Sequence, residues 1–539
     1  MIRRLPAIIA ALACCLSCVE INSEVGSNLL PGDQVYNIFI EQTVLEDIDL
    51  KMADSLSGYS QTNVVVGAIR DAEGRLSTRS SAVTIVPMSK TLDFGTDPQF
   101  KSFHLGLACD TVSTDNPNFT RSLQNVRAYE LDKALSKREF NCNSKISHSD
   151  VSVLRNSPVL NGRDSLSMDL TKEFAEKFFS LTKDDLSSLD KFLKKIPGIY
   201  IETDEPIGEG GRINNLQLQF GYDSEYNELT GNFAKLSFRS KYNGVQKDTS
   251  FLFMLGATDI FDGDSLLYYT ASGAMYPQYA LNLTDEESVR EREGKADETI
   301  FICGGGGIKP RIPAAWLKKT VADMITAKGG DPKKAIINKA SIEIPFEFPD
   351  DYTQMSKYPL ILSPTTRILT DTTAAFVSLT DASDETENSG EINRSLLKYS
   401  PDFSYHMQTL LSTDDEEIAT GKYDVWLLVM NYYTVTTDNS DAELSEYYEQ
   451  LAYQSYYNNM YGGYGGGYGG YGYNSYSNYY NYMMMAQYAA NNVSVSSTIQ
   501  LDIANYYRAY LCGPNYPDKT KRPLLKITFS IPRPEQNKQ

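Results

Sequence analysis

The sequence predicts a mainly β protein: tandem antiparallel β-sandwich (jelly-roll-like) domains with a few short helices. Short runs in which apolar and polar residues alternate recur along most of the chain, and such alternation places one face of a strand on a core and the other in solvent. Helical periodicity is found at only three places. The length of 539 residues exceeds the size at which a single core stops growing, so two or more domains are expected.

The first residues are typical of a bacterial lipoprotein signal. Arg3 and Arg4 precede an apolar run over residues 5–16, which ends at Ser17-Cys18 and is too short to span a bilayer as a helix. We predict a signal peptide over 1–17, acylation (palmitate) of Cys18 and a lipidated N-terminal linker over 18–34. Several acyl chains, at about 0.8 kcal/mol per buried methylene, would make a stable anchor. An ordinary secretory signal with incidental cysteines is the alternative.

Residues 35–282 are expected to form an N-terminal β-sandwich region. Residues 170–181 and 184–195 carry the period of short amphipathic helices. The alternating runs that predict strands are 35–40, 63–69, 82–87, 103–107, 126–131, 199–201, 216–220 and 233–238.

An acidic stretch over 283–298 predicts the boundary to a C-terminal β-rich domain over 299–535. The apolar stripe of residues 314–328, followed by Gly329 and Gly330 as a stop, predicts a further helix. The tetraglycine Gly304–Gly307 lacks the Lys-Ser/Thr of a phosphate-binding loop, so we expect a flexible loop before this helix. The strands expected here are 342–348, 425–429, 499–503 and 525–531.

A Tyr/Gly-rich low-complexity insertion at about 446–490 interrupts the C-terminal domain. Residues 461–482 consist only of Tyr, Gly, Asn and Ser, and their Tyr spacing fits neither a helix nor a strand. The flanks, 423–435 and 493–503, read as strands, so we expect an excursion from one edge of a sheet. An idle loop, a partner contact and a glycan platform all stay open. The candidate contact residues are Tyr461, Tyr464, Tyr468, Tyr471, Tyr473, Tyr476, Tyr479, Tyr480 and Tyr482.

Charge and cysteine content narrow the function classes. The net charge of −19 disfavours nucleic acid as a partner. Beyond Cys18 the chain holds Cys109, Cys142, Cys303 and Cys512. The more local pair, Cys109 and Cys142, is the candidate disulfide, and free buried thiols are the equal alternative.

Several short motifs, taken in order, resemble an uncharacterised family of Bacteroidota lipoproteins, domain-of-unknown-function family 4270. They are Cys18 followed by VGSNLLP at 25–31, VRAYEL at 126–131, IPGIYI at 196–201 and INKASIEI at 337–344. The resemblance implies an envelope lipoprotein and supplies no catalytic residues.

No catalytic motif is found in the sequence. The three histidines, His104, His148 and His406, show no metal-binding spacing, and there is no nucleophile elbow. We therefore expect no enzyme activity, no cofactor and no metal. The leading hypothesis is a lipid-anchored outer-membrane protein, on the cell-surface or the periplasmic side, that is a non-catalytic structural or accessory subunit contacting an integral β-barrel or another envelope complex. A surface glycan- or nutrient-binding module is the alternative, and a glycan-active enzyme is a third.

Overall fold

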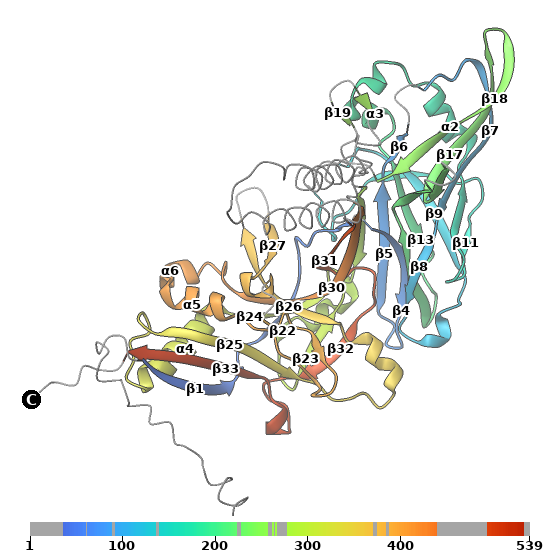
Figure 1. Cartoon of the computed structure of the whole chain (residues 1–539). Coiled ribbons are helices and arrows are strands. Elements are labelled where there is room, and N and C mark those ends of the chain that lie inside the picture. Colours follow the sequence, from blue (N-terminus) through green and yellow to red (C-terminus); the bar gives the residue numbers. More distant parts are fainter. Residues whose placement is uncertain are drawn as a thin grey trace, which may run out of the picture.

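The computed structural model describes residues 36–60, 62–88, 92–135, 140–223, 228–256, 261–262, 265–266, 278–369, 374–383, 387–438 and 493–532. Strands account for 47% of the structure and helices for 17%, which confirms the predicted mainly β class. Figure 1 shows an N-terminal lobe around β4, β5 and β7 and a C-terminal lobe around β25, β33 and α4. None of the described helices has the length and apolar character that a bilayer crossing requires.

The larger sheet of the N-terminal lobe is antiparallel and runs in the order β10-β9-β13-β5-β4-β14-β8, with β11 on β9 and with β21 on β3 and β5. Its central strand β4 is buried almost throughout, because the sandwich core covers one face and Ala504 and Tyr506 of the C-terminal lobe pack on the other. The strands are β3 (Tyr59–Ser60), β4 (Asn63–Arg70), β5 (Leu76–Val83), β8 (Cys109–Ser113), β9 (Gln124–Leu131), β10 (His148–Ser152), β11 (Val159–Leu160), β13 (Ile199–Thr203), β14 (Gly210–Gln217) and β21 (Ala280–Asp285).

A second antiparallel sheet, in the order β12-β7-β17-β18-β6, packs against the first. Inward residues of both sheets, such as Val66 and Phe103, share one core with the helices α2 (Lys172–Phe179) and α3 (Leu189–Lys195). This packing is a β-sandwich. Its second sheet consists of β6 (Ile85–Pro87), β7 (Thr96–Leu107), β12 (Leu166–Asp169), β17 (Phe233–Tyr242) and β18 (Val245–Leu255).

The run predicted as one strand over 82–87 belongs to both sheets. β5 ends at Val83 and pairs with β4, whereas β6 begins at Ile85 and pairs with β18. The chain therefore crosses from one sheet to the other at Thr84. Alternation alone carries no signal for such a crossing, because both halves of the run are apolar and buried.

The C-terminal lobe combines two antiparallel sheets, a short strand pair and three helices. One sheet has the order β1-β33-β25-β29-β28 and the other the order β22-β2-β24-β30-β26-β27, with β31 on β30. The strands are β1 (Tyr36–Val44), β2 (Asp49–Met52), β22 (Gly294–Lys295), β23 (Thr299–Cys303), β24 (Ile308–Ile312), β25 (Ile336–Pro345), β26 (Ile361–Leu369), β27 (Ala374–Ser378), β28 (Ile392–Asn393), β29 (Lys398–Tyr399), β30 (Val425–Asp438), β31 (Val493–Leu501), β32 (Arg508–Cys512) and β33 (Leu524–Pro532). The helices are α4 (Ala314–Ala327), α5 (Ser404–Ser412) and α6 (Asp415–Ile418).

Two short strand pairs and six short 3₁₀ turns complete the described elements. The pairs are β15 (Phe220–Asp223) with β16 (Glu228–Gly231) and β19 (Phe261–Asp262) with β20 (Ser265–Leu266). The turns are η4 (Pro117–Phe119), η5 (Asp185–Ser187), η6 (Glu287–Arg292), η7 (Tyr352–Lys357), η8 (Thr380–Ser383) and η9 (Lys519–Lys521).

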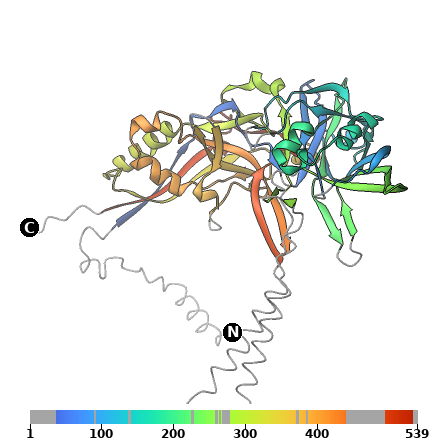
Figure 2. The same ribbon diagram turned by 90° about the horizontal axis from the view of Figure 1, so that it is seen from above.

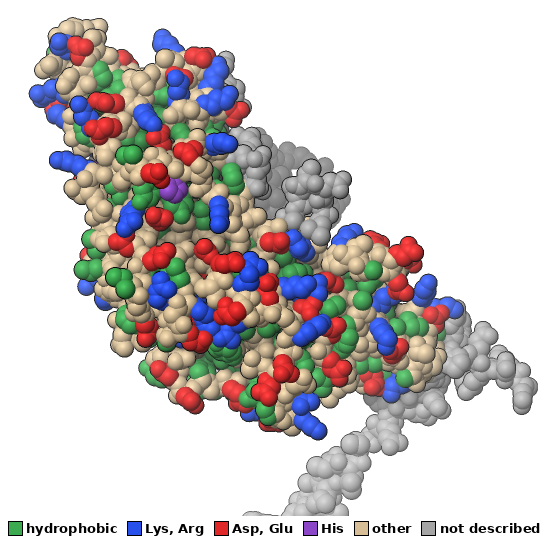
Figure 3. Space-filling model, turned by 180° about the vertical axis from the view of Figure 1, so that it is seen from behind, with side chains coloured by type: hydrophobic (Ala, Val, Ile, Leu, Met, Phe, Trp, Pro, Cys, Tyr) green, Lys and Arg blue, Asp and Glu red, His purple; other side chains and the backbone are tan. Residues whose placement is uncertain are grey.

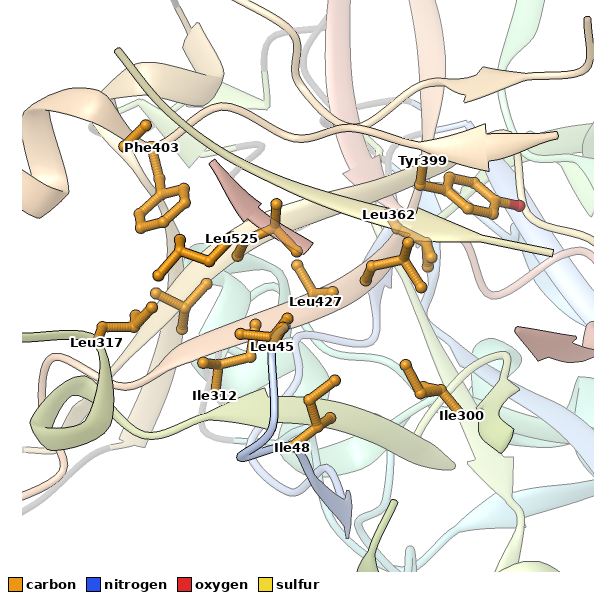
Figure 4. Packing of buried hydrophobic residues seen from close by; sticks show 14 of the residues in the cluster. Leu45, Ile48, Ile300, Ile312, Leu317, Leu362, Tyr399, Phe403, Leu427 and Leu525 are labelled. Carbon is orange, nitrogen blue, oxygen red and sulfur yellow. The ribbon is translucent and has the colours of Figure 1, made fainter. Parts of the chain in front are cut away.

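The first two described strands, β1 and β2, lie in the C-terminal lobe. The sequence assigned them to the N-terminal region over 35–282, but β1 pairs along its whole length with β33, and β2 pairs with β24. Figure 4 shows Leu45 and Ile48, from the segment between these strands, among core side chains such as Leu317, Leu427 and Leu525. The first and the last described strands thus lie in one lobe, and the N-terminal sandwich is a long excursion from it.

The flanks of the Tyr/Gly insertion are strands, as the sequence predicted, and the structure pairs them with each other in antiparallel orientation. β30 and β31 are in register from Met430 opposite Leu501 to Asp438 opposite Val493. In Figure 2 these orange and red strands extend away from the body of the molecule.

Candidate functional site

The predicted site residues fall into two groups. Cys18 and the nine tyrosines from Tyr461 to Tyr482 lie outside the described residues. Cys109 and Cys142 are described, and both are free thiols, so the predicted disulfide is not formed. Cys109 lies on β8, whereas Cys142 contacts β21 through its carbonyl, which accepts from Thr284 N.

The sheet order explains why these two cysteines do not meet. β21 pairs with β5, and β4 and β14 lie between β5 and β8. At about 4.8 Å per strand, this separation exceeds the Cα distance of about 7 Å that a disulfide can bridge.

The histidines have structural environments. His406 is buried, its Nε2 lies 2.9 Å from the Tyr423 carbonyl oxygen, and burial lowers its pKa. His148 is stacked between Tyr129 and Tyr200, with ring centroids 4.9 and 4.6 Å away. His104 lies on the surface, 3.0 Å from an Asp169 oxygen. Within the described ranges, no group of three or more His, Cys, Asp or Glu side chains is arranged to hold a metal.

A buried ion network joins the two lobes; it comprises Arg79, Glu286 and Arg508 with Ser77. Arg79 donates to Glu286 Oε1 (2.6 Å), and Arg508 and Ser77 each donate to Oε2 (2.8 Å). Arg79 also donates to the Ile503 carbonyl (3.0 Å). Burial alone would raise the pKa of Glu286, but the charges of Arg508 and Arg79 outweigh it and lower this pKa to about 2. Because separating the lobes would leave these buried charges without their partners, the network fixes the lobes against each other.

The tetraglycine lies at the same contact between the two lobes, which we call the joint. It is a buried, hydrogen-bonded turn and not the flexible loop that the sequence predicted. Gly306 N donates to Thr284 Oγ1 (2.9 Å), and Ala53 N donates to the Gly307 carbonyl (3.1 Å). A Cβ on Gly306 would lie 2.3 Å from the Asn143 side chain. A side chain at position 306 would therefore displace Asn143, whose amide donates to the Gly306 carbonyl (3.3 Å).

Lys309 lies beside this loop and is fully buried. Its Nζ donates to the carbonyls of Cys303 (2.5 Å) and Gly307 (3.3 Å), and no carboxylate of the described residues forms a salt bridge with it. Burial lowers the pKa of Lys309 to about 8. The joint therefore contains a charge that costs stability at neutral pH.

The outward face of β1 carries an exposed apolar patch. Tyr36, Ile38 and Ile40 occupy alternate positions of the strand with exposures of 41%, 66% and 79%. Exposed Ile336 of β25 lies in the same row as Ile38, two strands away, with the buried Ser530 between them. We call these four residues the β1 patch. Tyr36, Ile38 and Ile40 are neighbours on one face of the strand, and neighbouring exposed apolar side chains of this kind mark interaction surfaces, unlike scattered single ones.

β1 is also an edge strand. Within the described part of the chain it pairs only with β33, while its inward Phe39 stacks on Phe529 with centroids 5.7 Å apart. Glu41 forms a 2.6 Å salt bridge with Lys328 of the C-terminal lobe. The sequence YNIFIEQTV contains neither the lysine nor the proline that commonly protects an exposed edge. The strand is therefore firmly held on one side and open to pairing on the other.

Two cavities lie between the lobes. The larger, of about 710 Å³, is strongly polar, and several of its charges are already paired, such as Arg290 with Glu287 and Glu293. The smaller, of about 310 Å³, lies between β3, β4 and β21 on one side and the end of β31 on the other. We call the smaller cavity the amide pocket, because Asn63, Asn282 and Gln500 line it. Away from the cavities, Figure 3 shows acidic and basic side chains interspersed over the face that it draws.

Comparisons with protein-family models, curated proteins and solved structures found no match for this chain. The resemblance to family 4270 therefore stays a prediction.

Proposed function

We propose that this protein is a lipid-anchored, non-catalytic accessory subunit of a bacterial outer membrane, and that β1 attaches it to an integral envelope protein. The observation that carries the proposal is the β1 edge: nine residues long, without lysine or proline, and apolar on its outward face. A partner that adds a strand to β1 would form hydrogen bonds with the unpaired backbone groups of this edge and would cover the β1 patch at the same time.

The chemistry of the edge favours a polypeptide partner over the lipid bilayer itself. Acyl chains would cover Ile38 and Ile40, but they offer nothing to the backbone N–H and C=O groups of a strand edge. A partner strand with apolar residues at alternate positions supplies both the hydrogen bonds and the packing.

The position of β1 in the chain supports an envelope location for this contact. Tyr36 follows the proposed acylation site Cys18 by eighteen residues, a stretch that reaches at most about 60 Å when fully extended. An acylated Cys18 would therefore hold β1 close to the membrane, where the effective concentration of a membrane-embedded partner is high. The residues that resemble the Bacteroidota lipoprotein family agree with this location.

Affinity capture from detergent-solubilised envelopes tests the docking proposal. We expect the tagged protein to recover a stoichiometric integral partner, and we expect Ile38→Lys with Ile40→Lys to lose it, because two charges would face the partner strand. Ile207→Lys is the matched control, since Ile207 is fully exposed in the other lobe. Equal recovery with the double variant would refute docking through β1.

The anchor is tested separately. We expect the N-terminal peptide of the mature protein to start at Cys18 with the mass of attached acyl chains, and Cys18→Ser to prevent acylation and release. An unmodified N-terminus in a freely soluble product would contradict the lipid anchor without bearing on the β1 edge.

A further inference from the structure

The amide pocket is a cavity with a polar anchor that the protein itself leaves unused. Asn63, the first residue of β4, lies on its wall and is 7% exposed. Its backbone N–H donates to Ser60 Oγ and its carbonyl accepts from Asn282 Nδ2 (3.1 Å). The described residues provide no hydrogen-bond partner for its side-chain amide. A largely buried amide beside a cavity is costly unless a ligand or water pairs with it.

The wall around Asn63 is held rigidly. Asn282 Oδ1 accepts from Val65 N (2.9 Å) and from Ser81 Oγ (2.5 Å), so its orientation is fixed on β21. The pocket is therefore preformed on paired strands of the N-terminal lobe, which lowers the cost of ordering a site when a ligand binds.

The lining selects the charge of the ligand. The described residues of the wall are all uncharged: amides, serines, tyrosines and aliphatic side chains. In a chain of net charge −19, an anion would meet repulsion and a cation would find no counter-charge inside the pocket. An entirely apolar ligand would leave the Asn63 amide without a hydrogen bond, which would cost about 1–3 kcal/mol of binding free energy.

A neutral ligand with hydroxyl groups on its edge and an apolar face matches this lining. Tyr59, Tyr279 and Leu501 contribute apolar surface, while Asn63 contributes its amide. The volume of about 310 Å³ corresponds to roughly ten waters at about 30 Å³ each, which suits one sugar ring and is too small for a longer segment of polypeptide. We infer that the amide pocket binds a single neutral sugar unit, a hexose or an N-acetylhexosamine, independently of the β1 docking edge.

Calorimetric titration of the full mature protein tests this inference. The micelles should be of lauryldimethylamine oxide, a detergent without a sugar headgroup, and the probes are D-glucose, D-galactose, D-mannose, N-acetyl-D-glucosamine and the charged analogue D-glucuronate. We expect at least one neutral probe to bind and glucuronate to bind more weakly. Asn63→Ala should weaken that binding by about tenfold, the loss of one hydrogen bond in a partly closed site.

Two further variants keep the result decisive. Asn118→Ala makes the same truncation at an exposed position outside the pocket and should bind like the wild type. If thermal unfolding shows that Asn63→Ala is not folded, Leu501→Ala, on the opposite wall, takes its place. The inference is overturned if no neutral probe binds, if glucuronate binds more tightly, or if binding is unchanged in the folded wall variants.

Discussion

Lys309→Met is predicted to change the stability of the protein in a way that depends on pH. The wild-type amine is fully buried, and its pKa falls from 10.5 to about 8. At 1.36 kcal/mol per pKa unit, the charged form costs the native state about 3 kcal/mol relative to the neutral form. Methionine has a similar shape and removes that cost.

The variant also loses something, because the Cys303 carbonyl no longer accepts from Lys309. The Gly307 carbonyl keeps a donor in Ala53 N. With about 1–2 kcal/mol for the lost bond, we expect Lys309→Met to be about 1–2 kcal/mol more stable than the wild type at pH 7.

Raising the pH should reverse this advantage. Above pH 8 the native lysine loses its proton, while the lysine of the unfolded chain keeps it until about pH 10.5, so the unfolded state binds more protons and the wild type gains stability. Between pH 7 and pH 10 the gain amounts to about 2.5 kcal/mol. The variant should therefore become the less stable protein near pH 10.

Guanidinium unfolding, followed by the fluorescence of Trp316 and Trp426, measures this difference in the C-terminal lobe that holds Lys309. Lys319→Met is the matched control, because the Lys319 side chain is 78% exposed on α4, and its difference from the wild type should not change with pH. A Lys309→Met difference that stays constant from pH 7 to pH 10 would refute the assignment of a buried, destabilising charge to the joint.

Glu286→Gln should destabilise the protein by about 3–5 kcal/mol, since it leaves two buried guanidinium groups without their carboxylate. The wild type should lose stability as the pH falls from about 4.5 to 2, because Glu286 becomes protonated, and this contribution to the loss should be absent from the variant when unfolding is measured at each pH. Gly306→Ala should lower the melting temperature because its Cβ would lie 2.3 Å from Asn143, whereas Gly208→Ala, whose Cβ meets nothing within 4 Å, should not. Of the four described cysteines, half-buried Cys109 should react first with a thiol reagent in the native protein, and the three buried ones only on unfolding; rapid labelling of all four would contradict the packing of the joint.

Alternation predicted the strands well where one face of a sheet meets a core. The expected runs over 126–131 and 525–531 match β9 and β33, and the helix expected over 314–328 matches α4. These elements follow from local periodicity, which the sequence displays directly.

Long-range pairing left no local signal. β1 lies in the C-terminal lobe because of β33, nearly 500 residues further along the chain, and no pattern within residues 36–44 names that partner. Helix α5 was missed because it is only nine residues long and its N-cap residue, Phe403, makes no capping bond; the first turn is capped instead by Asp381, more than twenty residues earlier in the chain.

The candidate sites were even less visible in the sequence. Glu286 lies within the acidic stretch 283–298 that predicted a boundary, and its burial depends on arginines supplied by β5 and β32. Asn63 reads as an ordinary polar residue at the start of a strand. The β1 patch is visible in the sequence. Residues 36–40 carry apolar side chains at both even and odd positions, whereas a strand with one face in solvent needs them at only one of the two.

Site-specific photo-crosslinking in intact cells tests the central claim, that β1 is a docking edge, most directly. A photoreactive phenylalanine analogue at position 40, on the exposed face of β1, should form one discrete adduct with an integral outer-membrane protein. The same analogue at position 207, equally exposed but in the N-terminal lobe, should not form it. Absence of any adduct at position 40, or the same adduct at both positions, would contradict the account.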